Sequence, residues 1–227
     1  MGLWKRLGLL AVVCVWVAGT AQGAVITFRS GATAGTDPTN ISYVTVKAGP
    51  FMGFTSLSKA DFLEAQVTPA VVTGKRFSSW ITTLPADPAA QWISTGVLGG
   101  SEPSGLYAIR IDIGEGYFAT DAKLELFYAV DDFLGTETTS AIYLNGEPLR
   151  ANGTVGSYSS QNRLYFEDLT LNPGVNWIYI NVMNNNTYTG VIFSGTVTYT
   201  PIPVPEPVSL SLLAAGAAGL LARRRRG

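Results

Sequence analysis

The sequence contains no histidine, and its single cysteine, Cys14, lies in an apolar stretch near the N-terminus. Without histidine, the protein lacks the usual general base of nucleophilic triads and the commonest metal ligand. Because Cys14 falls in a segment that we expect to be removed, we expect no disulfide, thiolate chemistry or cysteine-bound zinc in the mature protein. The commonest nucleophilic and zinc-dependent mechanisms are therefore excluded.

Basic side chains are also scarce in the central part of the chain. Once the six bases near the two ends and Glu206 are set aside, residues 24–204 carry 15 acidic and 9 basic side chains, a net charge near −6. Duplex nucleic acid is held mainly by clustered Lys and Arg that neutralise its phosphates. Nucleic acid is therefore not an expected partner, whereas calcium and neutral glycans are electrostatically acceptable.

The first 23 residues have the three parts of a signal peptide. Lys5 and Arg6 precede an apolar run at 7–18, and a small-residue pattern ends at Gly23. The alternative, a retained membrane-spanning helix, needs about 20 apolar residues. We expect signal peptidase to cleave beside Gly23 or Ala24, which makes this an exported protein.

The C-terminal 27 residues also differ from the rest of the chain. Prolines alternate over 201–207, which favours an extended spacer and predicts that the folded domain, 24–200, ends near Thr200. An apolar stretch at 208–222 is followed by Arg223, Arg224, Arg225 and Arg226. Because these charges are costly to move across a bilayer, both ends stay inside and 24–207 faces outward.

Three features in fixed order occupy residues 205–227: the motif Pro205-Glu206-Pro207, a short apolar helix and the arginine cluster. This order resembles the sorting tails of the PEP-CTERM family. The resemblance implies recognition by an exosortase-type membrane peptidase, transient inner-membrane anchoring through 208–227, and cleavage near the motif. It also implies display at, or release from, the surface of a Gram-negative cell that makes exopolysaccharide. An ordinary single-pass anchor is the alternative.

Within 24–200, apolar residues recur mostly with period two, which is typical of short half-buried strands. The pattern predicts strands at 25–28, 41–47, 107–113, 123–130, 140–144, 163–169, 175–182 and 191–199. Asn145-Gly146 predicts a hairpin turn. One short helix is expected at 59–66, with Ser58 as its cap and Asp61 in a capping-box position. We therefore expect an all-β, antiparallel β-sandwich with one short helix, besides the N-terminal signal helix and the C-terminal apolar sorting helix.

Several of these segments resemble galactose-binding-like jelly-roll modules. There, a strand ending in paired acids (here Asp131 and Asp132) precedes a strand ending in Leu-Asn-Gly (144–146), and Gly-Val-Asn (174–176) opens a later strand. The resemblance covers 91–199 and leaves 24–90 unexplained. It implies a jelly-roll sandwich whose relatives often bind carbohydrate at loops on one end, sometimes beside a structural calcium. Apart from that calcium, no cofactor is expected.

The paired acids allow two interpretations. Carboxylates on a loop can ligate calcium, or they can accept hydrogen bonds from backbone amides and hold the loop. A glycoside hydrolase would instead need two acids about 5–9.5 Å apart in a cleft. Its candidates are Asp131, Asp132, Glu137, Glu167 and Asp168. Because neighbours on a strand point to opposite faces, spacing alone pairs none of them, and we predict no catalytic residue.

Aromatic and amide side chains form a second candidate site. A sugar platform would combine rings that cover apolar sugar faces with amides that bond hydroxyls, and its candidates are Tyr158, Trp177, Asn184, Asn185, Asn186 and Tyr188. Trp177 also alternates with isoleucines in one strand, so a place in the core stays open. The Asn-rich segment is equally typical of a plain loop.

Taken together, the sequence predicts a non-catalytic cell-surface or extracellular-matrix protein that binds carbohydrate or associates with biofilm exopolysaccharide. A purely structural matrix or adhesion protein is the alternative, and a glycoside hydrolase is a third. Carbohydrate binding predicts exposed aromatics near Tyr158 and Tyr188. A matrix protein predicts an exposed apolar patch or an open edge strand, and an enzyme predicts an acid pair with a perturbed pKa in a cleft.

Overall fold

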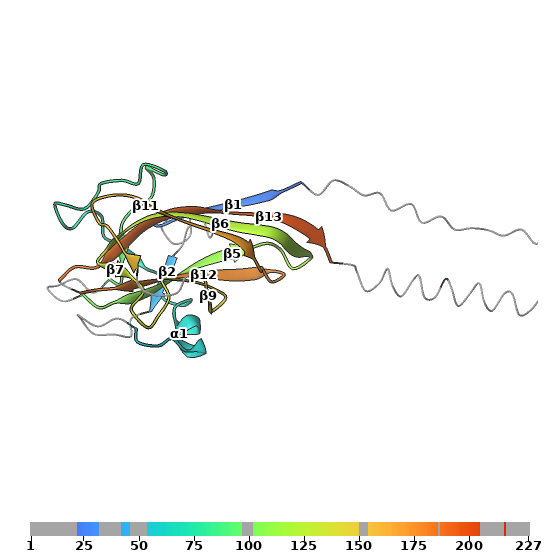
Figure 1. Cartoon of the computed structure of the whole chain (residues 1–227), viewed down its shortest axis with the longest axis horizontal. Coiled ribbons are helices and arrows are strands. Elements are labelled where there is room, and N and C mark those ends of the chain that lie inside the picture. The colour runs from blue at the N-terminus through green and yellow to red at the C-terminus, as the bar shows by residue number, and fades with distance from the viewer. Residues whose placement is uncertain are drawn as a thin grey trace, which may run out of the picture.

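A computed structural model describes residues 22–31, 42–45, 54–96, 102–149, 154–185, 187–204 and 216. These residues form two antiparallel β-sheets packed face to face (Figure 1), with one short helix outside them. The predicted β-sandwich with a short helix is therefore confirmed. The signal peptide before residue 22, the Pro205-Glu206-Pro207 motif and the arginines at 223–226 lie outside the described residues and stay predictions. Among the described residues, no helix is long and apolar enough to cross a membrane.

The first sheet is built around two long neighbouring strands, β6 (Tyr117–Asp131) and β13 (Gly190–Pro203). Its order is β11-β6-β13-β4-β3, and β1 pairs with β13 along the same edge as β4. The shorter strands are β1 (Ala24–Arg29), β3 (Val71–Val72), β4 (Ile93–Ser94) and β11 (Asn162–Leu169). Because β1 and β13 lie side by side, the described chain enters and leaves the sandwich at one end (Figure 1).

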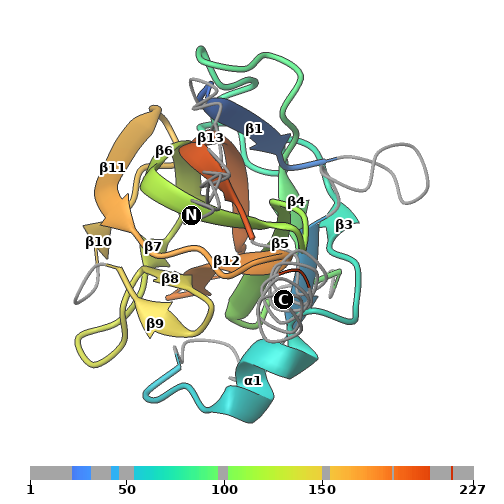
Figure 2. The same cartoon turned by 90° about the vertical axis from the view of Figure 1, so that its right-hand side faces the viewer.

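The second sheet is centred on β5 (Gly105–Asp112) and β12 (Val175–Met183). Its order is β10-β7-β12-β5-β2, and the hairpin β8-β9 pairs with β12 on the same side as β7. The flanking strands are β2 (Ser42–Thr45), β7 (Phe133–Leu134), β8 (Ile142–Leu144), β9 (Glu147–Pro148) and β10 (Thr154–Val155). Helix α1 (Lys59–Glu64) lies on the outer face of this sheet, as Figure 2 shows.

Alternation along the strands decides which side chains fill the core. In β12, Ile178, Ile180 and Val182 point between the sheets, whereas Trp177 and Tyr179 point outward beneath α1. The inward faces predicted for β5 and β6 are confirmed, because their apolar residues all join the central cluster: Tyr107, Ile109, Ile111, Ile113, Leu124, Leu126, Tyr128 and Val130. Burial of these side chains is the main force that holds the two sheets together.

The predicted turn and helix are both present, and each is stabilised by residues close to it in the sequence. Asn145 and Gly146 have φ angles of 55° and 91°, and Leu144 pairs with Glu147, which makes the two-residue hairpin that Asn-Gly favours. The Ser58 backbone N–H and hydroxyl both donate to Asp61 Oδ2 at 2.7 Å. The capping box is therefore confirmed, although α1 ends at Glu64, two residues before its predicted end.

The last strand runs further than the prolines suggested. We expected the domain to end near Thr200, but β13 continues to Pro203. The backbone N–H of Val204 donates to Gly116 O at 2.9 Å, on the side of β6. Pro201 and Pro203 alternate with it, so their missing N–H groups face away from β6, on the side where β1 pairs with earlier residues of β13. Proline is compatible with a strand in that position.

Candidate functional site

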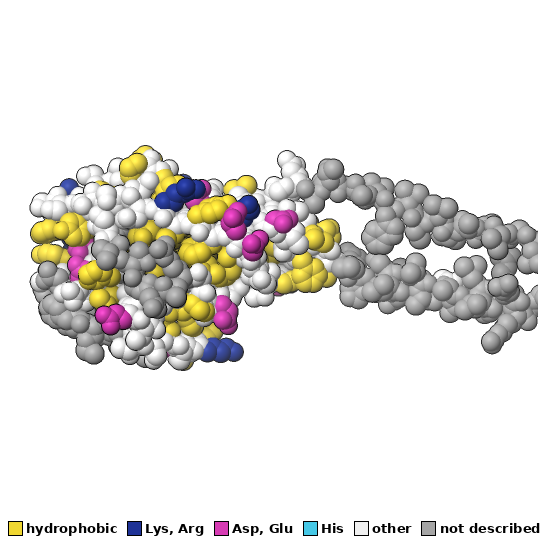
Figure 3. Space-filling model, in the orientation of Figure 1, with side chains coloured by type: hydrophobic (Ala, Val, Ile, Leu, Met, Phe, Trp, Pro, Cys, Tyr) yellow, Lys and Arg dark blue, Asp and Glu magenta, His cyan; other side chains and the backbone are white. Residues whose placement is uncertain are grey.

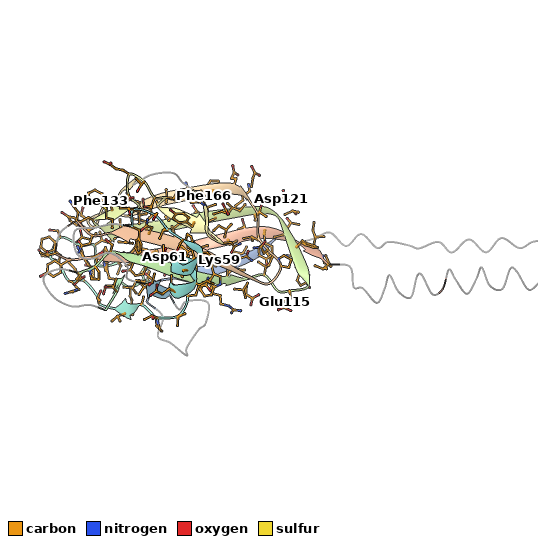
Figure 4. The ribbon with its side chains drawn as sticks, turned by 90° about the horizontal axis from the view of Figure 1, so that it is seen from below. Lys59, Asp61, Glu115, Asp121, Phe133 and Phe166 are labelled. Carbon is orange, nitrogen blue, oxygen red and sulfur yellow. The ribbon has the colours of Figure 1, made fainter. Side chains whose placement is uncertain are left out.

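The clearest candidate site is a hollow of 250 Å³ at the end of the sandwich opposite the ends of the described chain. Its lining comes from four separated segments: Phe77, then Asp131 and Asp132 at the end of β6, then Tyr158, and finally Thr187 and Tyr188 in the loop before β13. In Figure 4, Phe133, which follows Asp132, marks this end, and Glu115 marks the opposite one. We refer to this hollow as the end pocket.

The segment that supplies Phe77 is held by packing on the outside of the first sheet. Trp80 and Trp92 stack with ring centroids 4.1 Å apart, and both are fully buried with Ala129 of β6 and Ile192 of β13. This segment belongs to the part of the chain that the jelly-roll resemblance left unexplained. Its contribution to the pocket was not predicted, because no local pattern tells which strand end a loop packs against.

Asp131 is the deepest acid of the end pocket, with 7% of its surface exposed. The indole Nε1–H of Trp80 donates to Asp131 Oδ2 at 2.8 Å. Burial, followed by a hydrogen bond with the side chain of Asp132, raises the pKa of Asp131 to about 7, and the Trp80 indole opposes this shift. A carboxyl in this position changes its protonation near neutral pH, because losing water penalises its charged form.

Asp132 is less buried and organises the loop on the other side of the pocket. Its Oδ2 accepts the backbone N–H of Asn185 at 2.6 Å. Beside it, the hydroxyl of Thr189 donates to the backbone carbonyl of Asp131 at 3.1 Å. Backbone amides and hydroxyls therefore hold the paired acids against the loop that carries Tyr188, as our loop-holding interpretation proposed.

Three aromatic rings form a wall of the end pocket. The ring of Phe77 lies 6.3 Å from those of both Tyr158 and Tyr188, edge-on to the first at 88° and tilted by 32° to the second. Tyr158 is 36% exposed and Phe77 is 42% exposed. Arg76 lies with its guanidinium 5.1 Å from the centre of the Tyr188 ring and pairs with the buried Glu102. The rings of Phe77 and Tyr158 are therefore accessible to a ligand, and Arg76 holds the ring of Tyr188 in place.

The asparagines of the predicted sugar platform differ in burial and in their hydrogen-bond partners. Asn184 is fully buried: its backbone N–H bonds Ser104 Oγ at 3.0 Å, and its side-chain amide donates to the carbonyl of Glu102. Asn185 is exposed and bonds Asp132 through its backbone. Asn186 lies outside the described residues. Asn184 thus positions the loop, and Asn185 alone of the described pair keeps a side chain at the surface.

Trp177 does not join the end pocket. It lies six residues before Met183, whose carbonyl accepts the Asp132 N–H, and six residues of extended strand span roughly 20 Å. Trp177 instead lines a separate hollow of 450 Å³ between α1 and the second sheet, which we call the helix groove. Its other lining residues are Leu57, Lys59, Phe62, Leu63, Gln66, Asn145, Gly146, Glu147, Asn172 and Tyr179. Figure 4 shows Lys59 on the helix that borders it.

The remaining acids proposed for a hydrolase do not converge on the end pocket. Glu167 pairs with Lys123 at 2.8 Å on the outside of the first sheet, and this contact lowers the Glu167 pKa. Figure 3 shows basic and acidic side chains side by side over this sheet. Glu137 and Asp168 are exposed and do not line the pocket. Only Asp131 and Asp132 of the five candidates share one hollow.

The paired acids offer few ligands for calcium. Calcium takes six to eight oxygens, and one oxygen of each carboxylate already accepts an N–H. The described part of the chain contains no group of three or more His, Cys, Asp or Glu placed to hold a metal ion. These two carboxylates alone fall short of a calcium shell, so the calcium site stays a prediction.

Comparison with known proteins gives only distant likenesses. No protein-family model matches the sequence, and no curated protein matches it. Among solved structures, a family 35 carbohydrate-binding module from Clostridium thermocellum is similar at 13% identity and a TM-score of 0.34, over 56% of this chain and 86% of that one. One from Paenibacillus barcinonensis is similar at 15% identity and 0.34, over 69% and 96%. An exo-β-1,3-galactanase from Phanerochaete chrysosporium is similar at 16% identity and 0.31, over 57% and 26%. At these TM-scores, none of them assigns a family or a ligand to this chain.

Proposed function

We propose that this chain is a non-catalytic carbohydrate-binding protein of the cell surface or extracellular matrix, with the end pocket as its sugar site. One observation carries the proposal: the fold gathers three partly open aromatic rings and two carboxylates around a single hollow. Aromatic faces cover the apolar faces of sugar rings, and carboxylates accept hydrogen bonds from sugar hydroxyls. A galactose-binding-like jelly-roll is the finer fold assignment that goes with this function.

The acid pair itself argues against glycoside hydrolysis. A perturbed pKa in a cleft is what an enzyme would show, and Asp131 has one. However, each carboxylate already accepts a hydrogen bond that holds the fold, Asp131 from the Trp80 indole and Asp132 from the Asn185 backbone. The other three candidate acids do not line this hollow, so no acid from another segment faces the pair, as the two acids of a glycosidase cleft would. We therefore assign the pair to binding.

The proposal also includes export and sorting, which we infer from the sequence. Signal peptidase would remove residues 1–23, and an exosortase would recognise Pro205-Glu206-Pro207 with the apolar stretch and arginines behind it. The end pocket lies away from the last strand residues, so the tail would leave it facing outward, towards exopolysaccharide. Replacing Glu206 with Ala and following release of the chain tests this part. Unchanged processing would contradict sorting by an exosortase.

A structural matrix or adhesion protein is the second candidate function, and a different surface favours it. Tyr117 and Phe118 at the start of β6 are 44% and 47% exposed, and Ile202 of β13, the pairing partner of Phe118, is 43% exposed. Figure 3 shows hydrophobic side chains at this end of the sandwich. Exposed apolar surface of this kind commonly marks an interaction site.

A glycan array separates the two candidates. The purified full chain, kept in detergent because of its apolar end segments, would be screened with and without calcium. We expect binding to a subset of glycans, lost when Tyr158 and Tyr188 are replaced with Ala. Tyr165, an exposed tyrosine outside the pocket, is the matched control. Silence across the array under both conditions would move the assignment to the structural role.

A further inference from the structure

The charge of the end pocket indicates which class of sugar it binds. We infer that the pocket binds an amino sugar whose amine is free and positively charged, with the ammonium between the Asp131 and Asp132 carboxylates and the aromatic wall. This inference rests on the proposed carbohydrate-binding function. It names the chemical class of the ligand, which a general affinity for glycans does not.

The two carboxylates of the end pocket form no ion pair with a described cation, in contrast to four other acids of the domain. Asp87, Asp112, Glu125 and Glu167 each lie within 3.2 Å of an arginine or lysine nitrogen. Within the described part of the chain, neither acid of the end pocket forms such a pair. The nearest cation along the aromatic wall, Arg76, is already paired with Glu102. The pocket therefore offers negative charge that no described cation neutralises, and this charge is greatest above pH 7, where Asp131 is ionised.

The aromatic wall favours the same kind of ligand. Aromatic rings attract a cation that lies over their faces, and clusters of such rings are a known way to bind ammonium groups. Arg76 already occupies one face of the Tyr188 ring, 5.1 Å from its centre, so Phe77 and Tyr158 are the rings left for a ligand. The exposed rings of Phe77 and Tyr158 are open on the pocket side. A neutral sugar would use their apolar surface but not this electrostatic attraction.

The size of the hollow limits how much of a polysaccharide enters it. At 250 Å³ it lies below the roughly 300–1,000 Å³ typical of pockets for drug-sized ligands. It therefore suits one sugar unit, at a chain end or projecting from a chain, with the remainder outside. Burial raises the pKa of Asp131, and an ammonium beside this carboxyl would favour its ionised form.

Two matched oligosaccharides test the inference by calorimetry on the full chain in detergent: a β-1,4-linked glucosamine tetramer and its fully N-acetylated form. We expect the amine form to bind at least about tenfold more tightly, because only it carries the cation. Equal or tighter binding of the acetylated form would overturn the amino-sugar inference and leave carbohydrate binding intact. Binding of neither would overturn the amino-sugar inference, and the glycan array would then decide whether carbohydrate binding stands. Binding of tri-lysine as tight as that of the amine tetramer would show a plain cation site and also overturn the inference.

Conservative variants locate the binding. Asp132→Asn keeps an oxygen that can accept the Asn185 N–H but removes the charge, and we expect it to reduce the preference for the amine form about tenfold. Asp121→Asn is the control: Asp121 is exposed, has a φ of 52° that asparagine tolerates, and lies well away from Phe133 in Figure 4. If both variants bind like the parent chain, or both lose the preference equally, the end pocket is not the amine site.

Discussion

The end pocket and the helix groove differ in size and in how their polar groups are used. The helix groove is the larger, 450 Å³ against 250 Å³. Some of its polar side chains are hydrogen-bonded within the fold: Gln66 donates to the Tyr179 hydroxyl at 2.5 Å, and Asn145 both donates to Asn176 and accepts the Trp177 N–H. The end pocket combines two neighbouring carboxylates, which no described cation neutralises, with a wall of three aromatic rings. This combination, and not the volume, makes the end pocket the candidate binding site.

The two hollows also depend on different parts of the chain. The helix groove is formed by α1 lying over neighbouring strands of one sheet. The end pocket needs the segment around Trp80 to pack on the first sheet before Phe77 reaches the paired acids. Its geometry should therefore be sensitive to core changes that leave the helix groove intact. The following predictions test that difference, and the three substitutions run from the largest expected effect to the smallest.

Replacing Trp80 with Ala should have the largest effect. Trp80 is 1% exposed, stacks on Trp92 and donates to Asp131. Removing a buried tryptophan costs about 3–5 kcal/mol of unfolding free energy, which urea denaturation followed by fluorescence would measure. Trp177→Ala, in the half-buried wall of the helix groove, should cost clearly less. Equal losses would contradict the view that the Trp80 segment is part of the core.

Truncating a ring of the end pocket should come next. Tyr188→Ala removes a ring that Phe77 and Arg76 contact, and central aromatic truncations commonly cost about 2 kcal/mol of binding free energy, or roughly 30-fold in affinity. The helix-groove variant Trp177→Ala should leave the affinity for the same glycan unchanged. If Trp177→Ala weakened binding and Tyr188→Ala did not, the assignment of the two hollows would be reversed.

Two replacements of Asp131 should separate its hydrogen bond from its charge. Asp131→Ala leaves the buried Trp80 N–H without its acceptor, which costs about 1–3 kcal/mol of unfolding free energy. Asp131→Asn retains an acceptor oxygen and should stay close to the parent stability while it weakens binding of cationic glycans. Thermal unfolding and calorimetry on the two proteins measure these effects. Equal stability of the Ala and Asn variants would show that the indole bond does not matter.

The pH dependence of stability tests the charge of Asp131 on its own. The pKa of Asp131 is raised to about 7 in the folded chain, whereas an unfolded aspartate titrates near about 3.9. The folded chain therefore binds the proton more tightly, and this contribution is complete below pH 4 and declines as the pH rises towards 7. Asp131→Asn should flatten that decline in denaturation curves taken from pH 4 to 8. If the stability of Asp131→Asn declined with pH as steeply as that of the parent chain, other titratable groups would be responsible for the decline.

Local residue patterns predicted most of the fold. The period-two alternation of β5 and β6 located the core faces, because burial on one side of a sheet imposes that period. Asn145-Gly146 and Ser58 with Asp61 predicted a turn and a helix cap from contacts only a few residues apart. The end of β13 was missed, because prolines fit a strand where their missing N–H groups face away from the partner strand, and only the pairing with β6 shows how far β13 continues.

The candidate site was predicted only in part. The sequence by itself singled out Tyr158, Tyr188, Asp131 and Asp132, since aromatic and acidic residues at strand ends and in loops suit a ligand site. Tertiary structure alone decided that these four meet, that Phe77 joins them, that Asn184 is buried and that Trp177 lies elsewhere. The physical reason is that alternation acts within one strand, whereas a pocket depends on which loops from distant segments pack over the same strand end.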